Sequence, residues 1–182
     1  MSEQLQAINT MRKRLDKALQ TYWSEMFALA YDNTWSAAHR ANHIYAHGHK
    51  LISLCVQINL MKLSAGNHLH KAWTEAKENH KEMRHCRDAK VVHPKIPDGD
   101  KQTVMQYFIK GVENKCNFML LSIRATSETE SQRLHWLHEL QSTIECAIDL
   151  GLITDEQSHD AYQVMNEYWH GNYSTETFNF TN

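Results

Sequence analysis

Apolar side chains recur at every third or fourth position along almost the whole chain, which is the period of an amphipathic helix. No segment of the sequence has the alternation of polar and apolar residues that is typical of a half-buried strand. The pattern therefore predicts an all-α fold. We expect a single-domain bundle of five or six helices over residues 1–171, followed by an irregular C-terminal tail over residues 172–182.

Breaks between the helices are predicted where turn-forming residues interrupt the apolar stripe. They fall at 32–34, 64–67 and 93–102. The third helix is predicted to continue to about Pro94, because the residue before a proline is driven out of helical geometry. Capping boxes predict helix starts at Ser127 and Thr154, and Gly151 predicts a helix end between them.

The composition narrows the class of protein further. Six glycines and two prolines in 182 residues are too few for a many-stranded sandwich, and no glycine-rich phosphate-binding pattern is present.

The first residues lack a signal-peptide pattern, and the longest uncharged apolar run, 51–61, is too short to span a bilayer. We therefore expect a soluble, cytoplasmic protein. The four cysteines lack a C-x-x-C spacing, so they are expected to be core thiols.

Histidine is abundant, with thirteen in the chain, and two of its patterns suggest metal ligation. Three E-x-x-H pairs have the spacing of a carboxylate-bridged di-iron bundle, but Glu82/His85 and Glu167/His170 are predicted to lie off the apolar stripes, whereas the ligands of a buried dimetal centre face the core. His39, His43 and His47 recur at steps of four, and two such histidines can ligate one zinc ion. The alternative is that they are boundary residues of the helix. On balance no resident metal and no cofactor are expected.

One short segment suggests catalysis. Arg87 and Asp88 are followed by four residues and then by His93, an arrangement that resembles the R-x(4–6)-H motif of HEPN-domain proteins. The resemblance covers about seven residues. It implies a small helical bundle and, for many members, metal-independent cleavage of RNA in defence or toxin–antitoxin systems. It further implies that Arg87, Asp88 and His93 are catalytic and that two protomers of a homodimer form a composite site.

The residue types suit this chemistry. A histidine can transfer the proton of a ribose 2′-hydroxyl or of the leaving oxygen. An arginine can stabilise the anionic phosphorane through paired hydrogen bonds. Because Pro94 ends the predicted helix, the chain can turn and bring His93 back toward Arg87.

The charge distribution supports a different class of function. Residues 1–124 carry 18 Lys and Arg against 11 Asp and Glu, whereas residues 125–182 carry 1 against 10. An acidic C-terminal third can engage a basic protein partner, as in a non-catalytic inhibitor or adaptor. The residues predicted to contact such a partner are Glu128, Glu130, Asp155 and Glu156. The alternative is that the acidic third neutralises the basic part of the same molecule or dimer.

Overall fold

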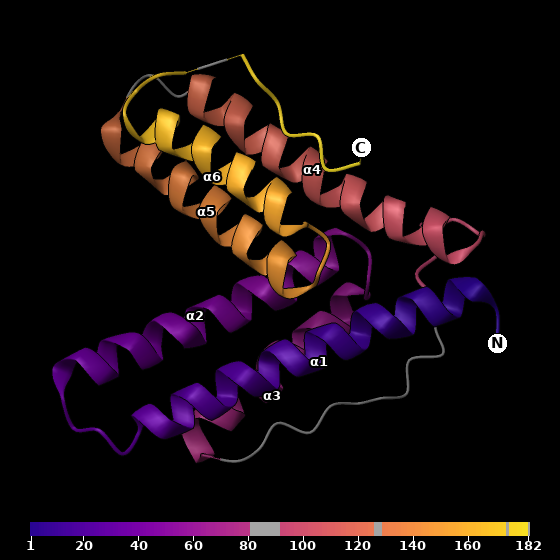
Figure 1. Ribbon diagram of the computed structural model, residues 1–182. Coiled ribbons are helices and arrows are strands. Elements are labelled where there is room, and N and C mark those ends of the chain that lie inside the picture. The colour runs from indigo at the N-terminus through magenta and orange to yellow at the C-terminus, as the bar shows by residue number, and fades with distance from the viewer. Residues whose placement is uncertain (81–91, 126–128, 174, 182) are drawn as a thin grey trace. The chain divides into compact units, whose positions relative to one another are not determined.

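The computed structural model describes residues 1–80, 92–125, 129–173 and 175–181, and these form six helices with no strand (Figure 1). The helices are α1 Glu3–Leu29, α2 Trp35–Gln57, α3 Leu63–Asn79, α4 Lys101–Ala125, α5 Glu130–Asp149 and α6 Asp155–Trp169. The predicted all-α bundle of five or six helices is therefore confirmed. Within the described ranges no helix has both the length and the apolar character needed to cross a membrane.

The helices form two compact units, Met1–Val104 and Met105–Asn182. In the first unit α1 packs against α2 and α3, and α2 packs against α3. In the second unit α5 packs against α6, and α4 contributes the apolar stripe predicted from the sequence. The buried residues of that stripe are Phe108, Val112, Cys116, Met119 and Ile123. The expected single domain over residues 1–171 stays a prediction.

The boundary between α2 and α3 differs from the sequence prediction. The expected break at 64–67 is wrong, because these residues lie in the first turns of α3. The chain turns earlier, where Asn59 has a positive φ of 64° and the Leu60 N–H donates to the Cys55 carbonyl. Gly66 is buried, and a Cβ there would lie 2.4 Å from Cγ2 of Val56. This glycine therefore permits close packing of α3 against α2 rather than ending a helix.

The end of α3 also differs from the prediction. The helix stops at Asn79, and His80 follows in the left-handed region with a φ of 50°. Trp73 and Ala76 are buried, whereas His80, one turn further along, is exposed. The loop predicted over 93–102 is irregular up to Asp100. Helix α4 then begins at Lys101, two residues earlier than predicted.

Capping residues mark the ends of α5 and α6 in the second unit. Thr154 and Gln157 form the predicted capping box at the start of α6, and Gly151 has a φ of 62° after α5. The predicted start of α5 at Ser127 is wrong. Thr129 is the N-cap, and its side chain accepts a hydrogen bond from the backbone N–H of Gln132. Ser127 lies outside the described residues.

Candidate functional site

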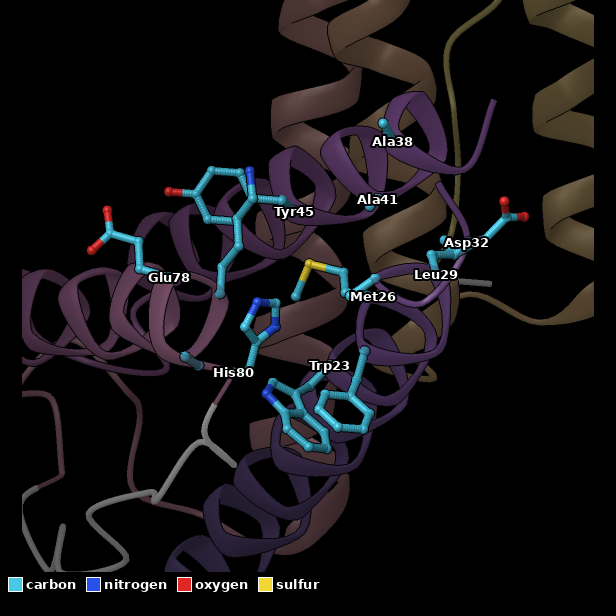
Figure 2. A pocket seen from close by; sticks show the side chains of 13 residues that line it. Trp23, Met26, Leu29, Asp32, Ala38, Ala41, Tyr45, Glu78 and His80 are labelled. Carbon is cyan, nitrogen blue, oxygen red and sulfur yellow. The ribbon is translucent and has the colours of Figure 1, made fainter. Parts of the chain in front are cut away.

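The three helices of the first unit line an open, mainly apolar pocket of about 440 Å³ (Figure 2). The end of α1, the first half of α2 and the end of α3 all contribute side chains to it. Its size is in the range of small-molecule sites, which are typically about 300–1,000 Å³ and lined mainly by apolar and aromatic residues. This pocket is the candidate functional site.

The sequence explains why a hollow forms here. On α1 the apolar face ends in large residues, with Trp23, Met26 and Phe27 lining the pocket. On α2 the facing positions are Ala38 and Ala41, and on α3 the facing position is Ala76. Alanine side chains are too short to fill the space that the large residues of α1 hold open, so the helices meet around an opening.

Aromatic rings form two walls of the pocket. The rings of Trp23 and Phe27 stack on α1 with centroids 5.1 Å apart, and the ring of Phe27 meets His80 at 6.4 Å. Figure 2 shows Tyr45 and Trp23 on opposite sides of the opening, with the His80 ring and the Met26 thioether between them. An apolar group that enters the opening can therefore contact aromatic, imidazole and thioether surfaces.

The charged residues at the rim bond mainly to the protein itself. Nζ of Lys77 donates to Oδ1 of Asn42 at 2.9 Å and lies 4.1 Å from the centroid of the Tyr45 ring. Asp32 accepts a hydrogen bond from the backbone N–H of Thr34 at 2.9 Å, which lowers the pKa of this carboxyl. These two charges are satisfied locally, while Glu78 adds a further charge to the lining, so an apolar group fits the interior of the pocket and not its rim.

A row of polar side-chain contacts extends from the pocket along the interface between α2 and α3. The Tyr45 hydroxyl lies 3.0 Å from Oγ1 of Thr74. Further along, the Nδ1 atoms of His49 and His70 are 2.8 Å apart, and Nε2 of His70 is 3.4 Å from Oγ of Ser53. Sequence reasoning missed this pair because His49 and His70 are 21 residues apart and match no motif.

The His49–His70 pair favours neutral rings. Burial lowers the pKa of both histidines, and for His49 the nearby His70 and Lys77 lower it further. A hydrogen bond between two Nδ1 atoms needs one ring to donate and the other to accept. The pair can therefore hold α2 and α3 together only while at least one ring is uncharged.

The predicted catalytic residues are only partly covered by the structure. Arg87 and Asp88 lie outside the described residues, so a catalytic role for them stays a prediction. His93 is half-buried in the loop before α4, and its Nδ1 accepts a hydrogen bond from the backbone N–H of Lys95 at 3.2 Å. With Nδ1 as the acceptor, the neutral ring carries its proton on Nε2.

Three of the four predicted partner-binding residues are described, and all three are exposed in first helical turns. Glu130 begins α5 and lies 3.9 Å from a guanidinium nitrogen of Arg133. Asp155 and Glu156 begin α6. Carboxylates in a first turn stabilise a helix through its dipole, so these positions have a structural role as well. Glu128 lies outside the described residues.

The histidine patterns form no metal-binding cluster in the parts of the chain that the structure describes, where no group of three His, Cys, Asp or Glu side chains converges. His39 and His43 are exposed on α2, and the ring of His39 stacks on Trp35 at a centroid distance of 5.3 Å. His47 instead meets the ring of Tyr22 at 5.1 Å. These contacts fit the boundary-residue alternative.

Comparison of the chain with protein-family models gives no match, and comparisons with curated proteins and with solved structures give none either.

Proposed function

We propose that this protein is a non-catalytic binding protein whose first unit takes up an apolar, flat or aromatic group. The observation that carries the proposal is the 440 Å³ pocket with Trp23 and Tyr45 on opposite sides. The group belongs either to a small molecule or to a side chain of a partner, and both would use the same apolar contacts. This class matches the adaptor-like function that the charge distribution favours.

The pocket can be tested with N-phenyl-1-naphthylamine, a neutral apolar dye that fluoresces when it leaves water. We expect the wild-type chain to bind the dye and Ala41→Phe, which fills the pocket, to bind it at least about 10-fold more weakly, equivalent to ~1.4 kcal/mol. Ala46→Phe is the matched control, because Ala46 is exposed on the same helix and does not line the pocket. Equal affinity of the two variants, with unchanged helicity, contradicts the proposal.

A metal-independent ribonuclease is the second candidate, and the half-buried position of His93 in the loop before α4 favours it. For proton transfer the His93 ring has to give up the hydrogen bond from the Lys95 N–H, so that Nδ1 can hold a proton while Nε2 exchanges one with the RNA. In this proposal Arg87 stabilises the charge that develops on phosphate, and Asp88 completes the motif. The RNA would be bound by a homodimer, as the HEPN resemblance implies.

The test of this second candidate is RNA cleavage in the presence of EDTA. Arg87→Ala should lower the rate about 10²–10³-fold, and His93→Ala about 10²–10⁴-fold. Arg133→Ala is the control, because Arg133 has a histidine five residues later but lies on α5. Products should end in a cyclic phosphate. Absence of cleavage by the wild-type chain, or equal loss in all three variants, contradicts a nuclease site at Arg87 and His93.

A further inference from the structure

The segment 175–181, here called the tail segment, lies along α4 in the second unit (Figure 1). Its residues bond to α4 in reverse order. The Glu176 carbonyl accepts from Arg124, Phe178 bonds to Asn117, and Phe180 bonds to Glu113. The tail segment and α4 therefore run antiparallel. No motif in the sequence indicated this arrangement.

Side chains of α4 and α6 bond the backbone of both phenylalanines completely. Asn117 accepts from the Phe178 N–H at 2.7 Å and donates to the Phe178 carbonyl at 3.0 Å. Glu113 accepts from the Phe180 N–H at 2.8 Å, and Gln157 of α6 donates to the Phe180 carbonyl at 3.0 Å. These side chains therefore satisfy the backbone N–H and C=O groups of an extended chain, as a neighbouring strand does at the edge of a sheet.

The spacing of the α4 residues matches an extended chain. Glu113 and Asn117 are four residues apart, a helical rise of about 6 Å. Phe178 and Phe180 are two residues apart, which is about 6.6 Å in an extended backbone. The turn of α4 from Glu113 to Asn117 therefore matches the step from Phe180 to Phe178.

The side chains of the tail segment alternate in burial in the same way. Phe178 and Phe180 are 6% and 4% exposed, and their rings stack at a centroid distance of 5.4 Å. Thr177 and Asn179, which point the other way, are exposed. Shape selection therefore acts on two alternate aromatic positions, while the backbone bonds tolerate any residue between them.

Glu113 is a buried carboxylate directed at this segment. It is only 4% exposed, and besides the Phe180 N–H it accepts from the Thr181 hydroxyl at 3.2 Å and from Lys110. Burial by itself would raise the pKa of Glu113, but the hydrogen bonds from Lys110 and Phe180 outweigh burial and lower it. A buried carboxylate of this kind needs donors from whatever occupies the groove.

We propose that the groove between α4 and α6, formed by Glu113, Asn117 and Gln157, is a recognition site for an extended polypeptide with two aromatic side chains at alternate positions. The tail segment is its resident, competing ligand. A partner protein with an exposed Phe-x-Phe segment would supply the two aromatic side chains and the backbone groups that this site binds. This inference concerns the second unit and is independent of the pocket in the first.

Competition follows from the covalent connection. Residues 170–174 join the tail segment to the end of α6, and a short covalent connection gives an effective concentration on the order of millimolar. A free peptide of similar intrinsic affinity cannot displace the tail segment at micromolar concentration. It can bind when the tail segment's own aromatic anchors are removed.

The test measures binding of a fluorescein-labelled peptide, Thr-Glu-Thr-Phe-Asn-Phe-Thr, to full-length chains by anisotropy. We expect the double variant Phe178→Ala/Phe180→Ala to bind the peptide at least about 10-fold more tightly than the wild-type chain, because its tail segment no longer competes. Asn179→Ala is the matched control and should behave as wild type, because Asn179 is exposed. Adding Asn117→Ala to the double variant should abolish binding.

Phe178→Ala alone is a milder variant that guards against misfolding of the double variant. The proposal is overturned if the folded variants bind the peptide no better than wild type, or if a peptide with both phenylalanines replaced by alanine binds equally well. The mass of the complex, measured by light scattering, should be that of one chain with one peptide. Complexes of two chains would overturn the proposal and assign the groove to exchange of tail segments between copies.

Discussion

The Nδ1 atoms of His49 on α2 and His70 on α3 lie 2.8 Å apart, so one proton between them joins the two helices. The ring centroids are 5.0 Å apart and the ring planes differ by 27°, which places the rings nearly edge to edge in a common plane. This geometry directs the two nitrogens at each other. If both rings carry a charge, two N–H groups meet and the contact is lost.

The first prediction concerns pH. Burial lowers the pKa of both histidines, so the unfolded chain binds protons more readily than the folded chain. The free energy of unfolding is then largest above the ordinary histidine pKa of about 6.5 and decreases as the pH falls below it. The ring of Tyr45 also contacts His49, and the positive charge of Lys77 lowers the pKa of His49 further. Denaturant midpoints at pH 7.5, 6.5 and 5.5 should show the decrease.

The control for this prediction is His39→Asn, which changes an exposed histidine of the same helix. It should leave the pH dependence unchanged, whereas His70→Asn should flatten it. If both variants keep the wild-type slope, the His49–His70 pair does not cause the loss of stability in acid.

The second prediction concerns the close contact between Gly48 and Trp73. A Cβ on Gly48 would lie 2.4 Å from Cε2 of Trp73, whose ring is fully buried and whose Nε1 donates to the Tyr45 carbonyl at 2.9 Å. Since the indole is held in place, Gly48→Ala should force α2 and α3 apart and lower the free energy of unfolding by about 1–3 kcal/mol. Urea denaturation measures this change.

Gly171→Ala is the comparison for Gly48→Ala. Gly171 has a φ of 79°, and a Cβ there would have no atom within 4 Å, so only backbone strain of about 1–2 kcal/mol is expected. In that variant the near-ultraviolet dichroism of the tryptophans should stay as in wild type, whereas Gly48→Ala should alter it. An unaltered spectrum for Gly48→Ala would contradict the steric argument.

The third prediction concerns the start of α6. Thr154 accepts from the Gln157 N–H at 3.2 Å, and the Gln157 side chain accepts from the Thr154 N–H at 3.0 Å. Thr154→Ala removes the cap and should cost about 1 kcal/mol of stability, while Thr154→Ser should retain most of it. Thermal denaturation compares the two. Equal loss in both variants would show that the threonine methyl group matters more than the hydrogen bond.

The fourth prediction concerns the acidic C-terminal third. If Glu128, Glu130, Asp155 and Glu156 form a partner surface, replacing all four with glutamine or asparagine should weaken capture of an octa-lysine probe at low salt. The difference from wild type should shrink at high salt, because salt screens exposed charges. Identical capture at low salt would mean that these carboxylates serve only their helices.

Local patterns predicted the helices well, because the period of apolar residues and the caps act over a few residues. Thr154 and Gly151 are examples. The errors arose where contacts between helices decide the structure. Gly66 resembled a helix break until its contact with Val56 was known. The pocket beside Trp23 was not predicted, because the alanines opposite it are far away in sequence. The tail segment was missed for the same reason, since its partners lie more than 60 residues earlier on α4.

The buried cysteines make local opening of this protein measurable. Cys55 on α2 and Cys116 on α4 are both fully buried, and burial raises the pKa of Cys116 to about 12. A thiol reagent attacks the thiolate, so modification has to wait until the surrounding helices separate and the side chain meets water. In a Cys86→Ser/Cys146→Ser background, the modification rate at Cys55 reports the opening of α2 in the first unit. The modification rate at Cys116 reports the opening of α4 in the second unit. The two rates therefore measure local opening of both units within the same molecule.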